Sequence, residues 1–144
     1  MDSFDQQYMV FQNIHRFRSI PEIEIVLPNG GAWKQAETIC NFVNNLSEEL
    51  VSPEELMSDH DPSIASLGRM LQEYRTILTE ANLMDFSSIQ IEAYRLLCDN
   101  EGILNELRSA ITHIMVDEYQ DTNYIQEQLV FLLAGERKNI CVVG

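Results

Sequence analysis

The sequence predicts a mostly helical fold that ends in a small α/β part. Apolar residues recur at helical spacing up to about residue 110, as in the stripe Ile64, Leu67, Leu71, Tyr74 and Leu78. Two short apolar runs, 114–116 and 140–143, then flank a helical stretch at 124–133. Strand, helix and strand within about thirty residues form a βαβ unit, so we expect a parallel strand pair with a right-handed crossover.

The first half contains several helix signals and one break. Ser3 is a candidate N-cap with Gln6 at capping-box spacing, and Phe4, Tyr8 and Phe11 begin an apolar stripe. The pattern breaks over 18–31, where 22–25 alternates like a short edge strand or an extended linker. A helix is predicted to restart near Ala32 and to run to between residues 46 and 50.

Cap signals define the following helices. Ser52-Pro53 predicts a short helix, and Asp61-Pro62 predicts a long one that Asn82 ends. Asp85 is the candidate cap of a helix that carries Ile89 and Leu96. A further helix is predicted over 101–110, and Gly135 should end the last one.

Composition fits one ordinary globular core. The chain has 144 residues, of which 45% are hydrophobic and 22% charged. Its longest apolar run, 129–134, cannot cross a bilayer, and its acidic start lacks the basic stretch of a signal peptide. We therefore expect no membrane partner and a cytoplasmic location. Cys40, Cys98 and Cys141 are predicted to be reduced and buried.

The net charge of −14 bears on partners. No Lys or Arg lies between Lys34 and Arg69, while that interval holds seven acidic residues. This argues against a phosphate-tracking surface there. The 35–68 segment is either a solvated acidic face or a face directed at a protein partner.

The most informative stretch is the acidic turn, which we define as residues 117–121. Ile114, Met115 and Val116 read as a strand buried on both faces and lead directly into Asp117 and Glu118. Acids at the carboxyl end of such a strand stand where open α/β sheets bind ligands. The spacing fits a Walker-B site, in which an Asp holds a nucleotide-bound magnesium ion.

The run Val-Asp-Glu-Tyr-Gln-Asp-Thr-Asn at 116–123 closely resembles motif II of the UvrD/Rep group of superfamily 1 DNA helicases. Segment 73–86 resembles the stretch before that motif, and 139–144 resembles the strand leading into motif III. The resemblance is specific from about residue 71 onward. It implies that 1–84 is the helical subdomain inserted into the helicase core, and that 85–144 is a partial RecA-like core domain ending at the start of motif III.

The resemblance also implies roles for individual residues. Asp117 would help hold Mg²⁺, Glu118 would be the general base for water attack on ATP, and Gln120 would contact the γ-phosphate side of ATP. The parent would be an ATP-dependent 3′-to-5′ DNA helicase of repair or recombination, with DNA bound only weakly by this segment alone. Ser87-Ser88 replace acids that the family usually carries after its Asp-Phe pair, so Asp85 is given only a structural, capping role.

No Gly-x-x-x-x-Gly-Lys-Ser/Thr phosphate loop occurs in the sequence. That loop supplies much of the positioning for phosphoryl transfer. We therefore expect an internal fragment that does not hydrolyse ATP by itself and that meets ATP and Mg²⁺ in its parent.

Two other functions are compatible with the residues. One is a helical protein-interaction module whose ATPase acids are vestigial. The other is a metal-dependent nuclease using Asp117, Glu118 and Asp121, which is weaker because three closely spaced acids need further ligands from elsewhere.

Overall fold

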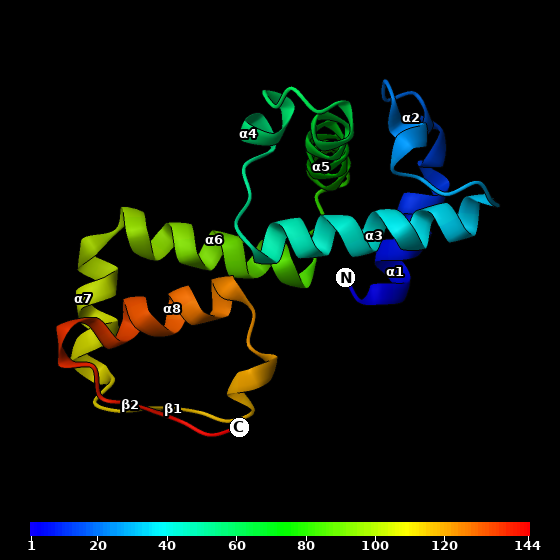
Figure 1. Cartoon of the computed structure of the whole chain (residues 1–144). Coiled ribbons are helices and arrows are strands. Elements are labelled where there is room, and N and C mark those ends of the chain that lie inside the picture. Colours follow the sequence, from blue (N-terminus) through cyan, green and yellow to red (C-terminus); the bar gives the residue numbers. More distant parts are fainter. The chain divides into compact units, whose positions relative to one another are not determined.

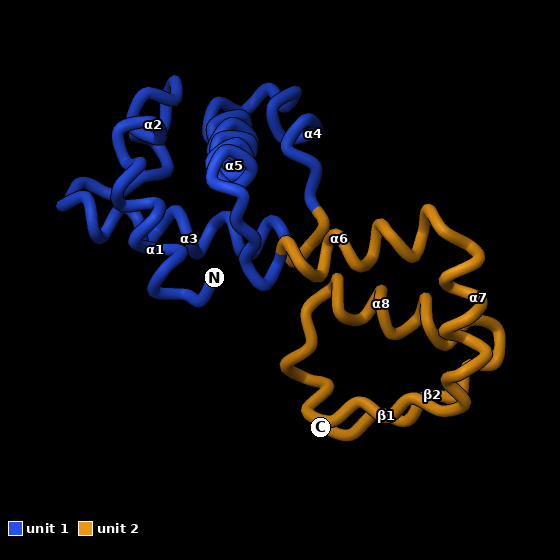
Figure 2. The backbone as a smooth tube through the Cα atoms, turned by 180° about the vertical axis from the view of Figure 1, so that it is seen from behind, with its two compact units in different colours: residues 1–47, 51–87 blue, residues 48–50, 88–144 orange.

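A computed structural model describes all 144 residues and divides into two compact units (Figures 1 and 2). The helical unit comprises residues 1–47 and 51–87, and the α/β unit comprises residues 48–50 and 88–144. Helices account for every element except two short parallel strands, which confirms the predicted fold class. None of the helices combines the length and hydrophobicity needed to span a bilayer.

The helical unit is built from five α-helices, one 3₁₀ turn and the start of a sixth helix. Its elements are α1 (Ser3–Gln12), α2 (Ile14–Arg18), η1 (Ile23–Ile25), α3 (Ala32–Glu48, to residue 47), α4 (Pro53–Met57), α5 (Pro62–Ala81) and the first residues of α6 (Phe86–Asp99).

Local capping explains most of these boundaries. Asp61 accepts a hydrogen bond from the Ser63 amide at 2.9 Å, Pro62 opens α5, and Asn82 ends it in the left-handed conformation. The prediction for α1 was one residue off. Asp2 rather than Ser3 is its N-cap, because the Asp2 carboxylate accepts the Asp5 amide at 2.8 Å.

The segment 22–25 is neither an edge strand nor an extended linker, so both readings of it were wrong. Glu22 takes a left-handed conformation with φ 62° and η1 follows it. The Leu27 amide then donates to the Ile23 carbonyl at 2.9 Å, so the backbone satisfies its hydrogen bonds locally. This winding buries Ile23 in the core and leaves Ile25 exposed.

The core of the helical unit joins α1, α2, α3 and α5, with large buried side chains such as Phe17, Ile39 and Leu71. Gly68 allows α5 to lie directly against α4. A β-carbon at Gly68 would stand 2.7 Å from the Met57 amide nitrogen and 2.8 Å from the Pro53 carbonyl oxygen. Both neighbours are backbone atoms, so only a glycine fits without displacement of α4.

Gly68→Ala is therefore expected to destabilise the helical unit by about 1–3 kcal/mol, the usual cost of overpacking. Denaturant unfolding followed by circular dichroism measures the change. Gly102→Ala in α7 is the matched control, because a β-carbon there meets nothing within 4 Å. Equal stability of the two variants would contradict the packing argument.

The α/β unit contains the rest of α6 and a strand, helix and strand. Its further elements are α7 (Glu101–Ala110), β1 (Ile114–Val116), η2 (Tyr119–Asp121), α8 (Tyr124–Ala134), η3 (Gly135–Arg137) and β2 (Ile140–Val142). Gly135 ends α8, as predicted, with φ 54°. The Arg108 guanidinium of α7 donates to the Leu132 carbonyl at 2.7 and 2.9 Å, which joins α7 to the end of α8.

Two predictions of burial are wrong in this unit. The strands are not buried on both faces, since Met115 is 80% exposed and Val142 is also exposed. Two strands without further neighbours cannot cover both of their faces. The prediction that all three cysteines are buried is also wrong. All three thiols are free, but only Cys40 is buried, while Cys98 and Cys141 are exposed.

The thiols should therefore react in two classes. Burial, and then the Asp85 carboxylate, raise the pKa of Cys40 from 9.0 to about 12, so its reactive thiolate is scarce at pH 8. A colorimetric disulfide reagent at pH 8 is expected to titrate two thiols rapidly and the third only after denaturant is added. The protection of Cys40 should fall as the pH rises from 9 toward 12. Rapid reaction of three thiols in the folded chain would show that Cys40 is accessible.

Candidate functional site: the acidic turn after the first strand

The acidic turn begins directly where the strand pair ends. β1 and β2 pair in parallel with Ile114 opposite Ile140 and Val116 opposite Val142. The Val143 amide donates to the Val116 carbonyl, and the Tyr119 amide donates to the Val143 carbonyl, both at 2.9 Å. The backbone on both sides of Asp117 and Glu118 is thus fixed to the residue that follows β2.

Asp117, Glu118 and Gln120 are all exposed within this turn. Asp117 accepts a hydrogen bond from the Glu118 amide at 3.0 Å, and the Gln120 amide group donates to the Glu118 carboxylate at 2.5 Å. Glu118 takes a left-handed conformation with φ 51°. Such a conformation is unfavourable for a residue with a side chain and is often found at functional sites. The turn therefore brings the three predicted residues together.

The charges of this turn are not neutralised by the protein. Neither Asp117 nor Glu118 forms an ion pair, and one oxygen of Asp117 accepts no hydrogen bond from the chain. Exposed carboxylate oxygens are the ligands that magnesium prefers, so Asp117 fits the ion by its chemistry. No group of three or more His, Cys, Asp or Glu side chains is placed to hold a metal ion. Asp121, the third acid of the nuclease hypothesis, does not complete such a group.

The following helix supports the turn. Asn123 caps α8 by accepting the Gln126 amide at 3.1 Å, and the Gln126 side chain accepts the Asn123 amide at 3.3 Å. This reciprocal pair is a capping box, which fixes the start of α8. The Tyr119 hydroxyl also donates to the Glu127 carboxylate. This second contact was not predicted from the sequence, although the eight-residue separation across a turn and a helix start is compatible with it.

A second acid, Asp85, has a very different environment inside the helical unit. It is 5% exposed and accepts hydrogen bonds from the Tyr74 hydroxyl and, at 3.4 Å, from the Gln6 side chain. Gln6 also donates to Asn44 at 2.7 Å and to the Tyr74 oxygen at 2.8 Å. Burial, together with the Asp85 charge, raises the pKa of Tyr74 well above its ordinary value, so its hydroxyl stays a donor. Asp85 therefore belongs to a buried hydrogen-bond network, while its capping of α6 stays a prediction.

The chain belongs to the UvrD/REP helicase N-terminal domain family, whose model matches residues 3–144. The UvrD/Rep resemblance stated from the sequence is thereby confirmed.

Individual relatives are similar to large parts of the chain. A probable DNA helicase II homologue of Mycoplasma capricolum is 36% identical over 148 residues, covering the whole chain and 19% of that protein. DNA helicase II of Escherichia coli is 32% identical, covering 72% of this chain and 14% of its own length. The ATP-dependent DNA helicase SRS2 of Saccharomyces cerevisiae is 35% identical, covering 78% of this chain and 9% of its own length. The chain thus spans less than a fifth of the length of these relatives.

Asn123→Ala removes the side-chain half of the capping box and should destabilise the start of α8 by about 0.5–2 kcal/mol. Because the acidic turn leads directly into this helix, amide hydrogen exchange should accelerate over residues 119–127, measured by mass spectrometry or NMR. Asn105→Ala in α7 is the control, since the Asn105 side chain caps no helix. Unchanged exchange over 119–127 would show that the cap does not support the turn.

Proposed function

We propose that this chain supplies the motif II half of the ATPase site of an ATP-dependent DNA helicase. The observation that carries the proposal is the exposed pair Asp117 and Glu118, which no protein cation neutralises, at the carboxyl end of β1. Family membership supports the same reading, because the matched relatives include DNA helicases and their match includes most of this chain.

Each residue of the turn has a distinct proposed task. Asp117 would hold Mg²⁺ through its exposed oxygens, and the ion, when bound with ATP, neutralises phosphate charge. Glu118 would accept a proton from the attacking water as general base. Gln120 is hydrogen-bonded to Glu118, so it can orient that carboxylate and respond to the γ-phosphate side of ATP. We propose that the longer helicase acts on DNA in repair or recombination. It would translocate along DNA with 3′-to-5′ polarity.

A chimera tests the role of Glu118. Residues 3–144 replace the matching segment of the Mycoplasma capricolum relative, which aligns along the whole chain. Glu118→Gln in this chimera is expected to lower the ATPase kcat by about 10²–10⁴-fold, the usual contribution of a general base, while nucleotide affinity is retained. Single-turnover ATP hydrolysis and fluorescent-nucleotide titration measure the two quantities.

Glu106→Gln is the matched control, since Glu106 is an exposed acid of α7 outside the turn. It should leave both quantities unchanged. Near-normal hydrolysis by the Glu118→Gln chimera would remove Glu118 from the catalytic role. The role of Asp117 is tested with Asp117→Asn in a chimera that hydrolyses ATP. If hydrolysis by this variant keeps the normal magnesium dependence, Asp117 does not hold the metal ion.

A further inference from the structure

Four aromatic side chains gather on the surface of the helical unit instead of in its core. We call them the aromatic ledge; they are Phe4, Tyr8 and Phe11 of α1 and Trp33 of α3. The Trp33 ring lies 6.0 Å from that of Phe4 and 5.5 Å from that of Phe11, between ring centroids, and Tyr8 stacks on Phe11 at 6.4 Å. Phe4 remains 63% exposed and Trp33 41% exposed. Clustered exposed aromatics of this kind mark binding surfaces.

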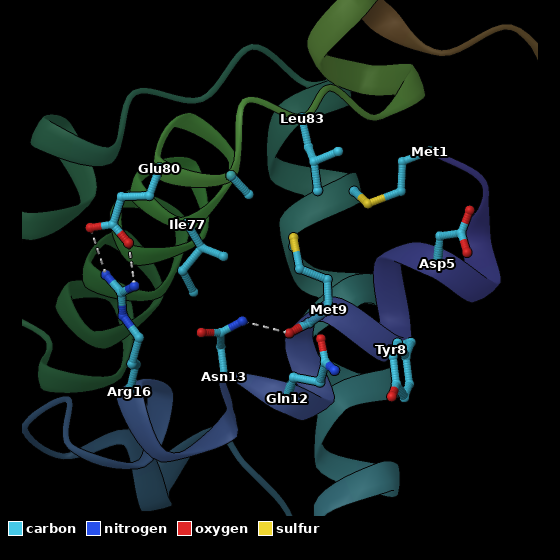
Figure 3. A pocket seen from close by; sticks show the side chains of 11 residues that line it. Met1, Asp5, Tyr8, Met9, Gln12, Asn13, Arg16, Ile77, Glu80 and Leu83 are labelled. Atoms are coloured by element: carbon cyan, nitrogen blue, oxygen red, sulfur yellow. Dashed lines mark hydrogen bonds and ion pairs between the residues drawn. The ribbon is translucent and has the colours of Figure 1, made fainter.

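The ledge continues into a groove between α1 and α5. Tyr8 belongs to both, and Figure 3 shows it at one side of the groove, with Met9 between it and Ile77 and with Leu83 above Met9. The groove has a volume of about 570 Å³. Its floor is apolar, while Gln12 and Asn13 add polar groups at one end. An aromatic ledge beside an apolar groove is suited to the apolar face of an amphipathic segment.

The charge around this surface is acidic. Asp5 and Glu80 stand at the groove, and Glu37 lies one helical turn beyond Trp33. Arg16, the only Lys or Arg that lines the groove, is paired with Glu73 at 2.5 Å and Glu80 at 2.6 Å. The ammonium group of Met1, which also lines the groove, donates to the Met84 carbonyl at 3.1 Å. Lys34 is the basic residue nearest to the ledge in the sequence. The helical unit as a whole carries twelve acidic against five basic residues, a formal charge of −7.

This charge selects among possible occupants. Exposed aromatics can stack on the bases of single-stranded nucleic acid, but such sites also need a basic groove to follow the phosphates. A second copy of the chain would bring a net charge of −14 to an acidic surface. Both occupants are repelled, whereas a positively charged segment is attracted.

We propose that the aromatic ledge and its groove dock a basic amphipathic helix of a partner protein. The apolar side chains of that helix would lie on Phe4, Trp33 and the groove floor, and its Lys or Arg residues would face Asp5, which forms no ion pair. This surface shares no residue with the acidic turn, so its test is independent of the ATPase proposal.

The probe is a fluorescein-labelled Leu/Lys peptide of about five helical turns with its leucines on one face. Fluorescence anisotropy with the full chain should give saturable binding that weakens as salt is added. The same pattern written with Leu and Glu, and a labelled oligothymidylate, should bind at least about tenfold more weakly, because like charges meet.

Phe4→Ser and Asp5→Asn should each weaken binding of the Leu/Lys peptide, and the double variant should weaken it at least about tenfold. Both side chains are exposed, so unfolding curves should match the wild type. Phe131→Ser and Asp59→Asn are the controls, an exposed aromatic and an exposed acid that neither belong to the ledge nor line its groove. They should leave the affinity unchanged.

Four results would overturn the proposal: no saturable binding, equal binding of the Leu/Glu peptide, tighter binding of the oligothymidylate, or equal losses in the control variants. Light scattering gives a further decisive readout. Self-association of the wild type that Phe4→Ser abolishes would assign the surface to a second copy of the chain.

Discussion

Burial of the Asp85 carboxylate is the constraint on which the helical unit depends. A buried charge is costly unless its hydrogen bonds are satisfied, and here the Tyr74 hydroxyl and the Gln6 amide group donate to it. These partners come from α5 and α1, and Gln6 reaches α3 through Asn44. Three helices must therefore be in place before Asp85 can be buried. Because α6 starts at the next residue, the same network fixes the point where the chain leaves this unit.

The network also decides which face of α1 is buried. Gln6 must point inward to reach Tyr74 and Asp85, and Met9 and Val10 share that buried face. Phe4, Tyr8 and Phe11 are then left outside, although they are the largest apolar residues of the helix. The aromatic ledge thus follows from the demands of a buried acid. A polar residue inside and aromatic residues outside reverse the usual distribution, which is the pattern expected where a surface has a task beyond folding.

The sequence predicted what depends on neighbouring residues. The helix starts at Ser52-Pro53 and Asp61-Pro62 and the stops at Asn82 and Gly135 are local signals, and the structure has all of them. The orientation of α1 could not be predicted in this way, because it depends on a partner 79 residues away. The exposure of β1 was also missed, since an apolar run indicates what a strand could bury and not which neighbours cover it.

The candidate site shows the same division. From residue 114 onward, the order of strand, acidic pair and helix was predicted from the sequence, and so was the parallel pairing of β1 with β2. The left-handed conformation of Glu118 and the Tyr119 contact with Glu127 were not, because both arise from how the turn closes against the end of β2. The assignment of Asp117, Glu118 and Gln120 to catalysis stays a prediction. So does the assignment of 1–84 and 85–144 to helicase subdomains. The helical unit ends at residue 87, and the α/β unit also includes residues 48–50.

The two acidic positions of the chain differ in what their surroundings allow. Asp85 is enclosed and its hydrogen-bonding capacity is used by protein donors, so it can hold helices together but has little left for a ligand. Asp117 and Glu118 are exposed, lie on a turn fixed by backbone hydrogen bonds, and keep charge that no Lys or Arg offsets. Burial and partners, more than residue type, therefore separate an acid that organises the fold from acids that are available to bind a cation.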